Sequence, residues 1–213
     1  MSEQKNDTEM TGADIAKIII NLVVIYAIGG MILATVYAKT SPVIFTKAKQ
    51  EKEERLKQMM PEADSIEKTG EWQIHHHGAG YYTAQKGGAP VGYIVETFGK
   101  GYSSYVNTLV ALDTKLVVQK IDVVSQKETP GLGDEVEDPA WKDLFKGKTL
   151  DTLKVVKDGD QRYIAAISGA TISSRAVTDD KLGGGVKGGV QMLTDVLSGK
   201  TQPKQAGNEG GQH

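Results

Sequence analysis

The stretch Ile167-Ser168-Gly169-Ala170-Thr171-Ile172-Ser173-Ser174 follows a β-like apolar run and opens a helical pattern. It predicts a strand, a tight turn of small residues and the N-terminus of a helix. Because Gly169 and Ala170 have almost no side chain, a large group can approach the backbone, and four hydroxyl side chains surround the same turn. The first N–H groups of a helix lack internal partners, so the turn suits a phosphate. An N-cap turn that binds nothing fits the same residues.

A second stretch with an unusual composition is Glu128-Thr129-Pro130-Gly131-Leu132-Gly133. Pro130 fixes one φ angle, while Gly131 and Gly133 permit positive ones, so the loop is bent into a specific shape from which Leu132 projects. A simple Pro-Gly turn would satisfy the same local rules. Between the two stretches, residues 141–145 predict a short helix, in which Trp141 is expected in the core rather than beside a ligand.

Both stretches resemble signatures of the FMN-binding domain family: Ser168-Gly169-Ala170-Thr171 with Ser173-Ser174 is similar to its flavinylation motif, and residues 128–133 to its second motif. The resemblance implies that Thr171 carries FMN through a phosphoester bond and that the second motif lies against the isoalloxazine ring. Residues 99–104 resemble the family's glycine-rich turn, although serines replace further glycines. The implied cofactor-binding residues are Thr171, Ser168, Gly169, Ala170, Ser173, Ser174, Glu128, Thr129, Pro130, Gly131 and Leu132.

One segment near the N-terminus is long and apolar. Residues 18–38 contain no charged side chain over 21 positions, and a helix of that length rises about 30 Å, enough to cross a bilayer. We expect one transmembrane helix, because the run is too long for a typical signal peptide and lacks a convincing cleavage site. Residues 43–60 predict a solvated spacer helix that ends at Pro61, with acidic and basic residues four positions apart.

From residue 80 the sequence predicts an antiparallel sheet. Two hairpins are expected, one around Gly87-Gly88-Ala89-Pro90 and one around Asp113-Thr114. A third hairpin is expected from residues 153–156 and 162–167, leading into the Ser-Gly-Ala-Thr turn. Three adjacent histidines, His75–His77, do not converge on one metal ion from a helix or a strand, so we expect a surface loop there.

Apolar residues at positions 182, 186, 190, 193 and 197 predict a helix that packs on the sheet. Five glycines between 183 and 189 weaken this helix, so either it is broken here or the glycines allow a close contact. The predicted class is therefore α+β, an antiparallel sheet with flanking helices, preceded by one transmembrane helix. The expected segments are a tail (1–17), the span (18–38), a spacer (39–61), an FMN-binding domain (62–200) and a disordered tail (201–213).

Composition excludes several kinds of site. The chain has 213 residues and no cysteine, so disulfides and thiolate metal sites are excluded. A net charge of −2 with scattered basic residues gives no sign of nucleic-acid binding.

The resemblance also implies partners. Membrane-anchored members of the family are electron-carrier subunits of ion-translocating complexes, either the Rnf ferredoxin:NAD oxidoreductase, which we favour, or the sodium-pumping NADH:quinone reductase, whose flavin-bearing member is generally longer. The expected partners are the other Rnf subunits, the membrane and a flavin transferase, and no complete active site is expected in this chain. A membrane-anchored interaction module with an empty flavin site is the alternative from a different class.

Two arguments disagree about the side of the membrane on which the large domain lies. Six basic residues follow the span within 39–57, against two before it, so the positive-inside rule alone puts the large domain in the cytoplasm. The family resemblance implies the outer side, where the transferase works. We expect the extracytoplasmic side.

Overall fold

The computed structural model describes residues 12–157, 159–202 and 204–205. These residues form two compact units that divide after Glu53. Most of the two expected tails, namely residues 1–11, 203 and 206–213, lies outside the described residues.

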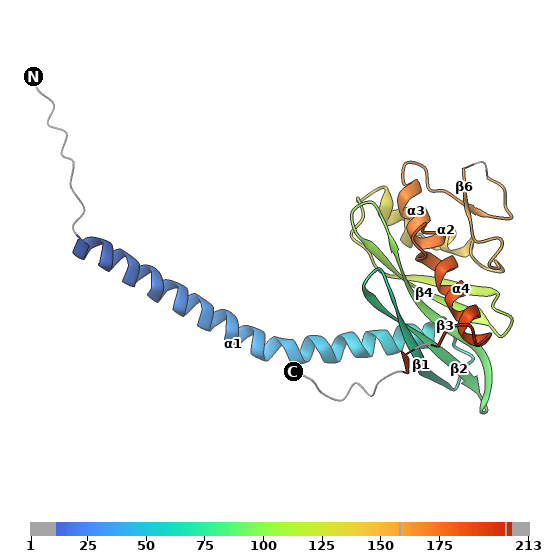
Figure 1. Cartoon of the computed structure of the whole chain (residues 1–213), viewed down its shortest axis with the longest axis horizontal. Helices are drawn as coiled ribbons and strands as arrows, with labels where there is room; N and C mark the ends of the chain where they lie inside the picture. The colour runs from blue at the N-terminus through green and yellow to red at the C-terminus, as the bar shows by residue number, and fades with distance from the viewer. Residues whose placement is uncertain (1–11, 158, 203, 206–213) are drawn as a thin grey trace, which may run out of the picture. The chain divides into compact units, whose positions relative to one another are not determined.

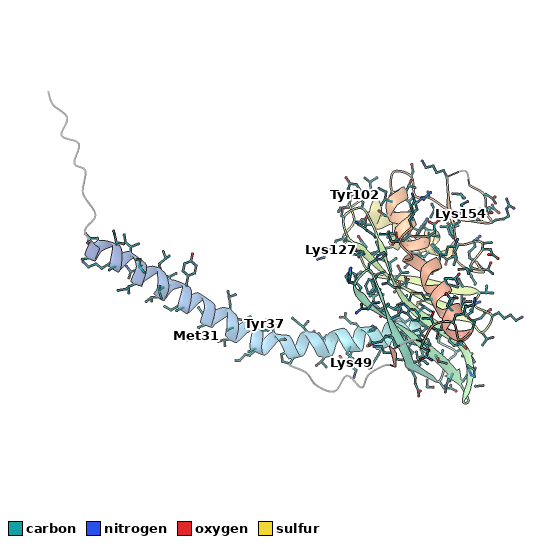
Figure 2. All side chains as sticks on the ribbon, in the orientation of Figure 1. Met31, Tyr37, Lys49, Tyr102, Lys127 and Lys154 are labelled. Carbon is teal, nitrogen blue, oxygen red and sulfur yellow. The ribbon has the colours of Figure 1, made fainter. Side chains whose placement is uncertain are left out.

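Helix α1 (Gly12–Met59) runs through both the predicted span and the predicted spacer, with Pro42 inside it. In the first unit its apolar side chains are exposed, as Figure 2 shows for Met31 and Tyr37, which are 72% and 71% exposed. This helix is long and apolar enough to cross a membrane once. Exposed apolar side chains over such a length suit a lipid environment.

The second unit is built on a sheet whose strands lie in the order β5-β4-β3-β2-β1-β8. Figure 1 labels β1, β2, β3 and β4 of this sheet. All neighbouring strands are antiparallel. Their bounds are β1 (Ser65–Ile74), β2 (His77–Lys86), β3 (Ala89–Lys100), β4 (Tyr105–Asp113), β5 (Val118–Ser125) and β8 (Lys204–Gln205).

The two predicted hairpins of this sheet are confirmed. Strands β2 and β3 are joined by Gly87 and Gly88, both with positive φ, and the turn between β4 and β5 is stabilised by the Asp113 side chain. The Asp113 carboxylate accepts hydrogen bonds from the N–H groups of Lys115 and Val117 at 2.8 and 2.9 Å. Such a side-chain bond to the following backbone is the usual means by which aspartate stabilises a turn.

Strand β1 and its turn were not predicted. His75 and His76 form the turn into β2, both with positive φ, and His77 begins that strand. His75 and His76 thus lie in a loop, as expected, with His76 exposed, but the prediction is wrong for His77, which belongs to the strand. The Nε2 atom of His75 lies 2.6 Å from Oδ2 of Asp180. Within the described residues no group of three or more metal-ligating side chains is present.

The sheet is covered on both faces. Helices α3 (Thr171–Thr178) and α4 (Gly185–Leu197) bury Val177, Val190 and Leu193 against strand residues such as Val95. On the other face, Leu56 and Met59 at the end of α1, and Met60 after it, are buried with Ile94 and Leu109. The spacer prediction is therefore wrong for this last turn, which is part of the core rather than solvated.

The glycine-rich segment before α4 combines a break in the helix with a close contact. The chain is broken there, because α3 ends at Thr178 and α4 begins only at Gly185, and Leu182 is 67% exposed. Within α4 a glycine does allow a close contact: a Cβ on Gly189 would lie 3.0 Å from Cγ1 of Val95. Both expectations thus hold, at different glycines.

The remaining elements lie between β5 and α3. The predicted short helix is present as α2 (Pro139–Asp143), preceded by the 3₁₀ helix η1 (Gly133–Glu137). The predicted third hairpin is wrong, since β6 (Val155–Val156) and β7 (Ile164–Ala165) pair in parallel.

Candidate functional site

The two sequence motifs meet at one hollow in the second unit. It has a volume of about 390 Å³ and is lined by residues of the Ser-Gly-Ala-Thr turn, the second motif and the β3–β4 turn. The lining residues are Tyr102, Glu128, Thr129, Leu132, Gly133, Gly169, Ala170, Thr171, Ile172 and Ser173.

Thr171 is the first residue of α3, as the sequence predicts. The preceding residue, Ala170, is the N-cap and makes no side-chain hydrogen bond to the helix. The opening N–H groups of a helix have no partner within it, and here no capping side chain competes for them. The turn therefore brings the start of α3 and Thr171 to the same hollow, an arrangement that suits a phosphate group.

Gly169 brings the second motif into contact with this turn. Its φ is +78°, and a Cβ added to it would lie 3.1 Å from Cδ2 of Leu132. A residue with a side chain would be strained by this backbone and would crowd Leu132. The close approach of Leu132 depends on glycine at this position.

Glu128 joins three segments through one carboxylate. Oε2 accepts hydrogen bonds from the Ser173 hydroxyl at 2.6 Å and the Tyr102 N–H at 2.9 Å. Oε1 accepts from the N–H groups of Ser103 and Ser104, each at 3.0 Å. Burial alone would raise the pKa of Glu128, but these bonds outweigh it and hold the pKa below its ordinary value.

The other hydroxyls of the first motif have different places. Ser174 is fully buried, where its hydroxyl accepts from the Ile167 N–H and donates to the Ala170 carbonyl, both at 3.0 Å. The Ser173 hydroxyl donates its hydrogen bond to the Glu128 carboxylate. Ser168 is exposed and does not line the hollow. Of the four hydroxyls, the geometry leaves Thr171 as the one that faces the hollow without a structural hydrogen bond among the described residues.

The second motif divides in the same way. Thr129 and Leu132 line the hollow, and Leu132 is 44% exposed. Pro130 and Gly131 shape the loop from outside, with Gly131 at a φ of +74°, and neither lines the hollow. The Thr129 carbonyl accepts from the Leu132 and Gly133 N–H groups at 3.2 and 3.0 Å, which closes the turn.

Tyr102 and Ile172 line the hollow but are absent from the residues expected from sequence. They are 74% and 51% exposed. Tyr102 lies in the turn at residues 99–104, which the resemblance indicated without assigning it a contact. Its exposure could not be read from the sequence, because it depends on how the turn is held by Glu128.

Trp141 is a core residue, as expected. Its indole N–H donates to the Ala165 carbonyl at 2.8 Å, and its ring meets Phe145 edge-on with the ring centroids 5.2 Å apart. It does not line the hollow.

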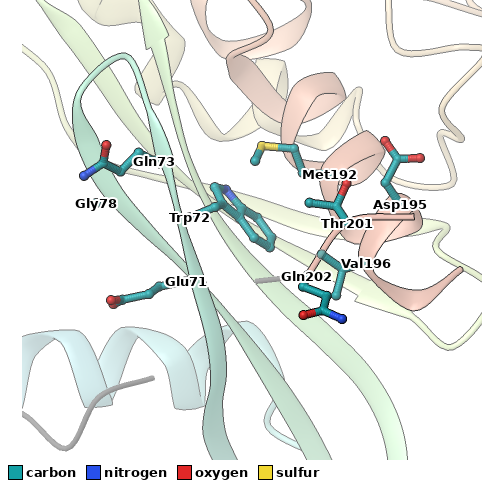
Figure 3. A pocket seen from close by; sticks show the side chains of 9 residues that line it. All are labelled: Glu71, Trp72, Gln73, Gly78, Met192, Asp195, Val196, Thr201 and Gln202. Carbon is teal, nitrogen blue, oxygen red and sulfur yellow. The ribbon is translucent and has the colours of Figure 1, made fainter. Parts of the chain in front are cut away.

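A separate hollow of about 330 Å³ lies between β1 and the end of α4 (Figure 3). Trp72 points toward Met192 and Val196, whereas Glu71 and Gln73, on either side of it along the strand, point away. None of the residues predicted from sequence to bind a ligand lines this hollow. The candidate site is therefore the hollow at Thr171.

Comparisons with known proteins agree with this location. The family model described as "FMN-binding domain" matches residues 101–179, which include both motifs and the β3–β4 turn. The G subunit of the proton-translocating ferredoxin:NAD(+) oxidoreductase complex of Clostridium ljungdahlii is 36% identical over 84% of this chain and 92% of its own length. The G subunit of the ion-translocating oxidoreductase complex of Methanosarcina acetivorans is 30% identical over 78% and 90%.

A shorter match is found to the C subunit of the Na(+)-translocating NADH-quinone reductase of Vibrio alginolyticus, 40% identical over 39% of this chain and 37% of that protein. The matches to the two G subunits, by contrast, extend over most of both chains. This protein thus belongs to the family of G subunits of ion-translocating oxidoreductase complexes and contains that family's FMN-binding domain.

Proposed function

We propose that this chain carries FMN bound through a phosphoester to Thr171 and serves as an electron-carrier subunit of an Rnf-type ferredoxin:NAD oxidoreductase complex that couples electron transfer to ion translocation. The observation that carries the proposal is the position of Thr171: it is the first residue of α3 and lines a hollow whose other wall is the second motif.

The residues present fit the phosphate end of FMN. The uncapped N-terminus of α3 offers backbone donors and a positive dipole end beside the Thr171 hydroxyl. Gly169 lines the same hollow and adds no side chain to it. Attachment at Thr171 would thus place the phosphate where its charge is stabilised.

The residues also fit the ring end. Tyr102, Leu132 and Ile172 give the hollow an exposed apolar rim, which suits a flat aromatic group. Bound there, FMN would supply the reversible acceptance and release of electrons. The chain's own residues hold the ring, shield part of it from water and leave the remainder open to a partner.

The complex is inferred from the relatives. Near full-length similarity to the two G subunits supports an Rnf-type assembly, in which the other subunits are the redox partners and a flavin transferase is needed for maturation. The shorter similarity to the C subunit of the sodium-translocating quinone reductase keeps that complex as the second candidate. In either, this chain would act as a redox subunit without a complete active site of its own.

The test is covalent flavin after co-expression with a flavin transferase. The wild-type chain should fluoresce in a denaturing gel, and its intact mass should increase by one FMN minus water. Thr171→Ala should abolish both signals, while Thr129→Ala, which removes a hydroxyl from the same hollow, should keep them. Covalent flavin in Thr171→Ala, or its loss only in Thr129→Ala, would refute the assignment, and no flavin in any form would favour an interaction module.

We further propose that the domain lies on the extracytoplasmic side, where a flavin transferase could reach Thr171. The basic residues that follow the span are interleaved with Glu51, Glu53 and Glu54, and other subunits could hold the span in place. Protease treatment of intact spheroplasts should digest the domain. Resistance until the membrane is broken would place it in the cytoplasm.

A further inference from the structure

Glu128 lines the hollow, yet its carboxylate is already saturated by the protein. It is 6% exposed and accepts four hydrogen bonds between 2.6 and 3.0 Å from Ser173, Tyr102, Ser103 and Ser104. The Ser104 hydroxyl lies at 3.4 Å as a fifth donor. A carboxylate with two oxygens has about four lone-pair positions, so little capacity is left for a ligand.

The space for this carboxylate is provided by two glycines. A Cβ on Gly101 would lie 2.5 Å from Oε1 of Glu128, and a Cβ on Gly133 would lie 2.7 Å from its Cβ and 2.8 Å from the Ser173 hydroxyl. Neither distance is compatible with a side chain. Gly101 and Gly133 thus let the β3–β4 turn and the second motif close around Glu128, independently of any positive φ.

We propose that Glu128 is a positioning residue that does not bind the flavin: it fastens the β3–β4 turn and α3 to the second motif and fixes one negative charge at the wall of the hollow. The part that concerns the flavin rests on the proposed function. The part that concerns the turn and α3 does not.

The fastening has a direct consequence for the hollow. Tyr102, on the turn, and Thr171, two residues before Ser173 on α3, both line it, and Glu128 is bonded to both segments. Loss of the carboxylate should release the turn, so Tyr102 would no longer be held over the site. Three successive N–H groups that donate to one carboxylate form a concavity that favours a negative charge.

The charge has a second consequence. A negative charge held in a partly desolvated wall opposes the arrival of further negative charge beside it. Glu128 should therefore lower the reduction potential of a flavin bound in the hollow. Because the donors keep Glu128 ionised, the effect persists at neutral pH.

The first experiment uses the full-length apoprotein in detergent micelles and needs no flavin. Acid titration of the wild-type chain followed by amide NMR should move the Tyr102, Ser103 and Ser104 N–H resonances together, and Glu128→Gln should show their final positions at neutral pH. Unlinked or absent shifts would overturn the fastening role. The wild-type titration answers the question even if Glu128→Gln fails to fold.

The second experiment uses the flavin-loaded chain and compares reduction potentials. Glu128→Gln removes the charge and should raise the potential, whereas Ser173→Ala removes a donor but keeps the charge and should not raise it. Glu128→Asp should return the potential toward the wild-type value. An unchanged potential in Glu128→Gln, or an equal rise in Ser173→Ala, would overturn the charge role.

The two proposals can fail separately. Intact mass reports whether FMN is attached at all, and the amide titration reports the fastening without it. Linked amide shifts in a chain that never takes up flavin would refute the proposed function and support the positioning role.

Discussion

The Ser173 hydroxyl donates a 2.6 Å hydrogen bond to the Glu128 carboxylate and thereby joins two motifs that lie 45 positions apart in the chain. Both side chains are buried, at 3% and 6% exposure. A charge-assisted hydrogen bond of this length in a buried setting is among the stronger polar contacts in a protein. The motifs therefore form one structural unit, and changes in either should affect the shared hollow.

Gly169→Ala should disrupt this unit more than an ordinary glycine change. Gly169 has a φ of +78° and would carry a Cβ 3.1 Å from Leu132, whereas Gly147 has nearly the same φ of +77° and nothing within 4 Å. Gly147→Ala should cost only the left-handed backbone, about 1–2 kcal/mol. Gly169→Ala should cost more in thermal unfolding and reduce covalent flavin. Equal losses of stability in both variants would show that the Leu132 contact is unimportant.

Leu132→Ala should separate ring contact from attachment. Leu132 projects into the rim of the hollow and is 44% exposed, so its truncation creates no large buried cavity. We expect stability to change by less than about 1 kcal/mol and covalent flavin to remain. The visible spectrum or the reduction potential should shift, because the ring loses an apolar neighbour. An unchanged spectrum and potential in a folded, flavin-loaded variant would argue against ring contact.

Acid should weaken the chain through Glu128. Its hydrogen bonds hold the pKa below the ordinary value of 4.5 in the folded state, so the ionised group contributes fully above that pH. The contribution is lost as the pH falls from 4.5 through the lower folded value. Protonation removes the charge that four hydrogen bonds stabilise, so a loss of stability should be visible in thermal unfolding. In Glu128→Gln, stability should fall less steeply as the pH decreases. An equally steep fall in the variant would show that other carboxylates cause it.

The sequence predicts the parts of the fold that local chemistry controls. Gly87 and Gly88 supply the positive φ angles of one hairpin turn, and Asp113 caps the other, so both hairpins follow from turn residues. Strand β1 was missed because its first half carries exposed, mostly polar side chains and only Gly70, Trp72 and Ile74 alternate inward. The parallel direction of β6 and β7 could not be predicted, since two residues in each strand carry no periodic signal.

The candidate site divides in the same way. The helix start at Thr171 follows from a small-residue turn before an apolar pattern. The roles of Ser173 and Glu128 could not be deduced, because they depend on backbone N–H groups of a turn that meets them only in the folded chain. Side chains that looked equivalent in the motif thus have different tasks.

Gly189→Ala should destabilise the chain although alanine favours a helix. A Cβ at this position would lie 3.0 Å from Val95 and 3.3 Å from Thr97 on β3, so α4 would have to move away from the sheet. Overpacking of this kind costs about 1–3 kcal/mol, which exceeds the gain of about 1 kcal/mol in helix propensity. Gly78→Ala, where a Cβ would meet nothing within 4 Å, serves as the control in thermal unfolding. A stabilised Gly189→Ala would mean that α4 packs less closely than described.

Asp179→Asn should stabilise the chain at neutral pH, because the pKa of Asp179 is shifted in the opposite direction to that of Glu128. Asp179 ends α3; its Oδ2 accepts from the Val155 N–H at 3.3 Å, while Oδ1 is buried without a partner among the described residues. Burial raises the pKa of Asp179, and the Val155 bond and the charges of Arg175, Lys187 and Lys154 do not offset it. The folded state therefore binds the proton more tightly than the unfolded chain, so stability falls as the pH rises from 3.8 through the folded value.

Above that pH range, the ionised carboxylate of Asp179 bears the full free-energy cost of burying its charge. Asparagine has no charge and avoids this cost, while its side-chain oxygen still accepts from the Val155 N–H. We expect a gain of up to about 1 kcal/mol at pH 7, small because the residue is only partly buried, and no gain under acid conditions where Asp179 is protonated. Thermal unfolding of both proteins across the pH range measures the difference. A variant that is less stable than wild type at pH 7 would mean that attraction to Arg175, Lys187 and Lys154 outweighs burial.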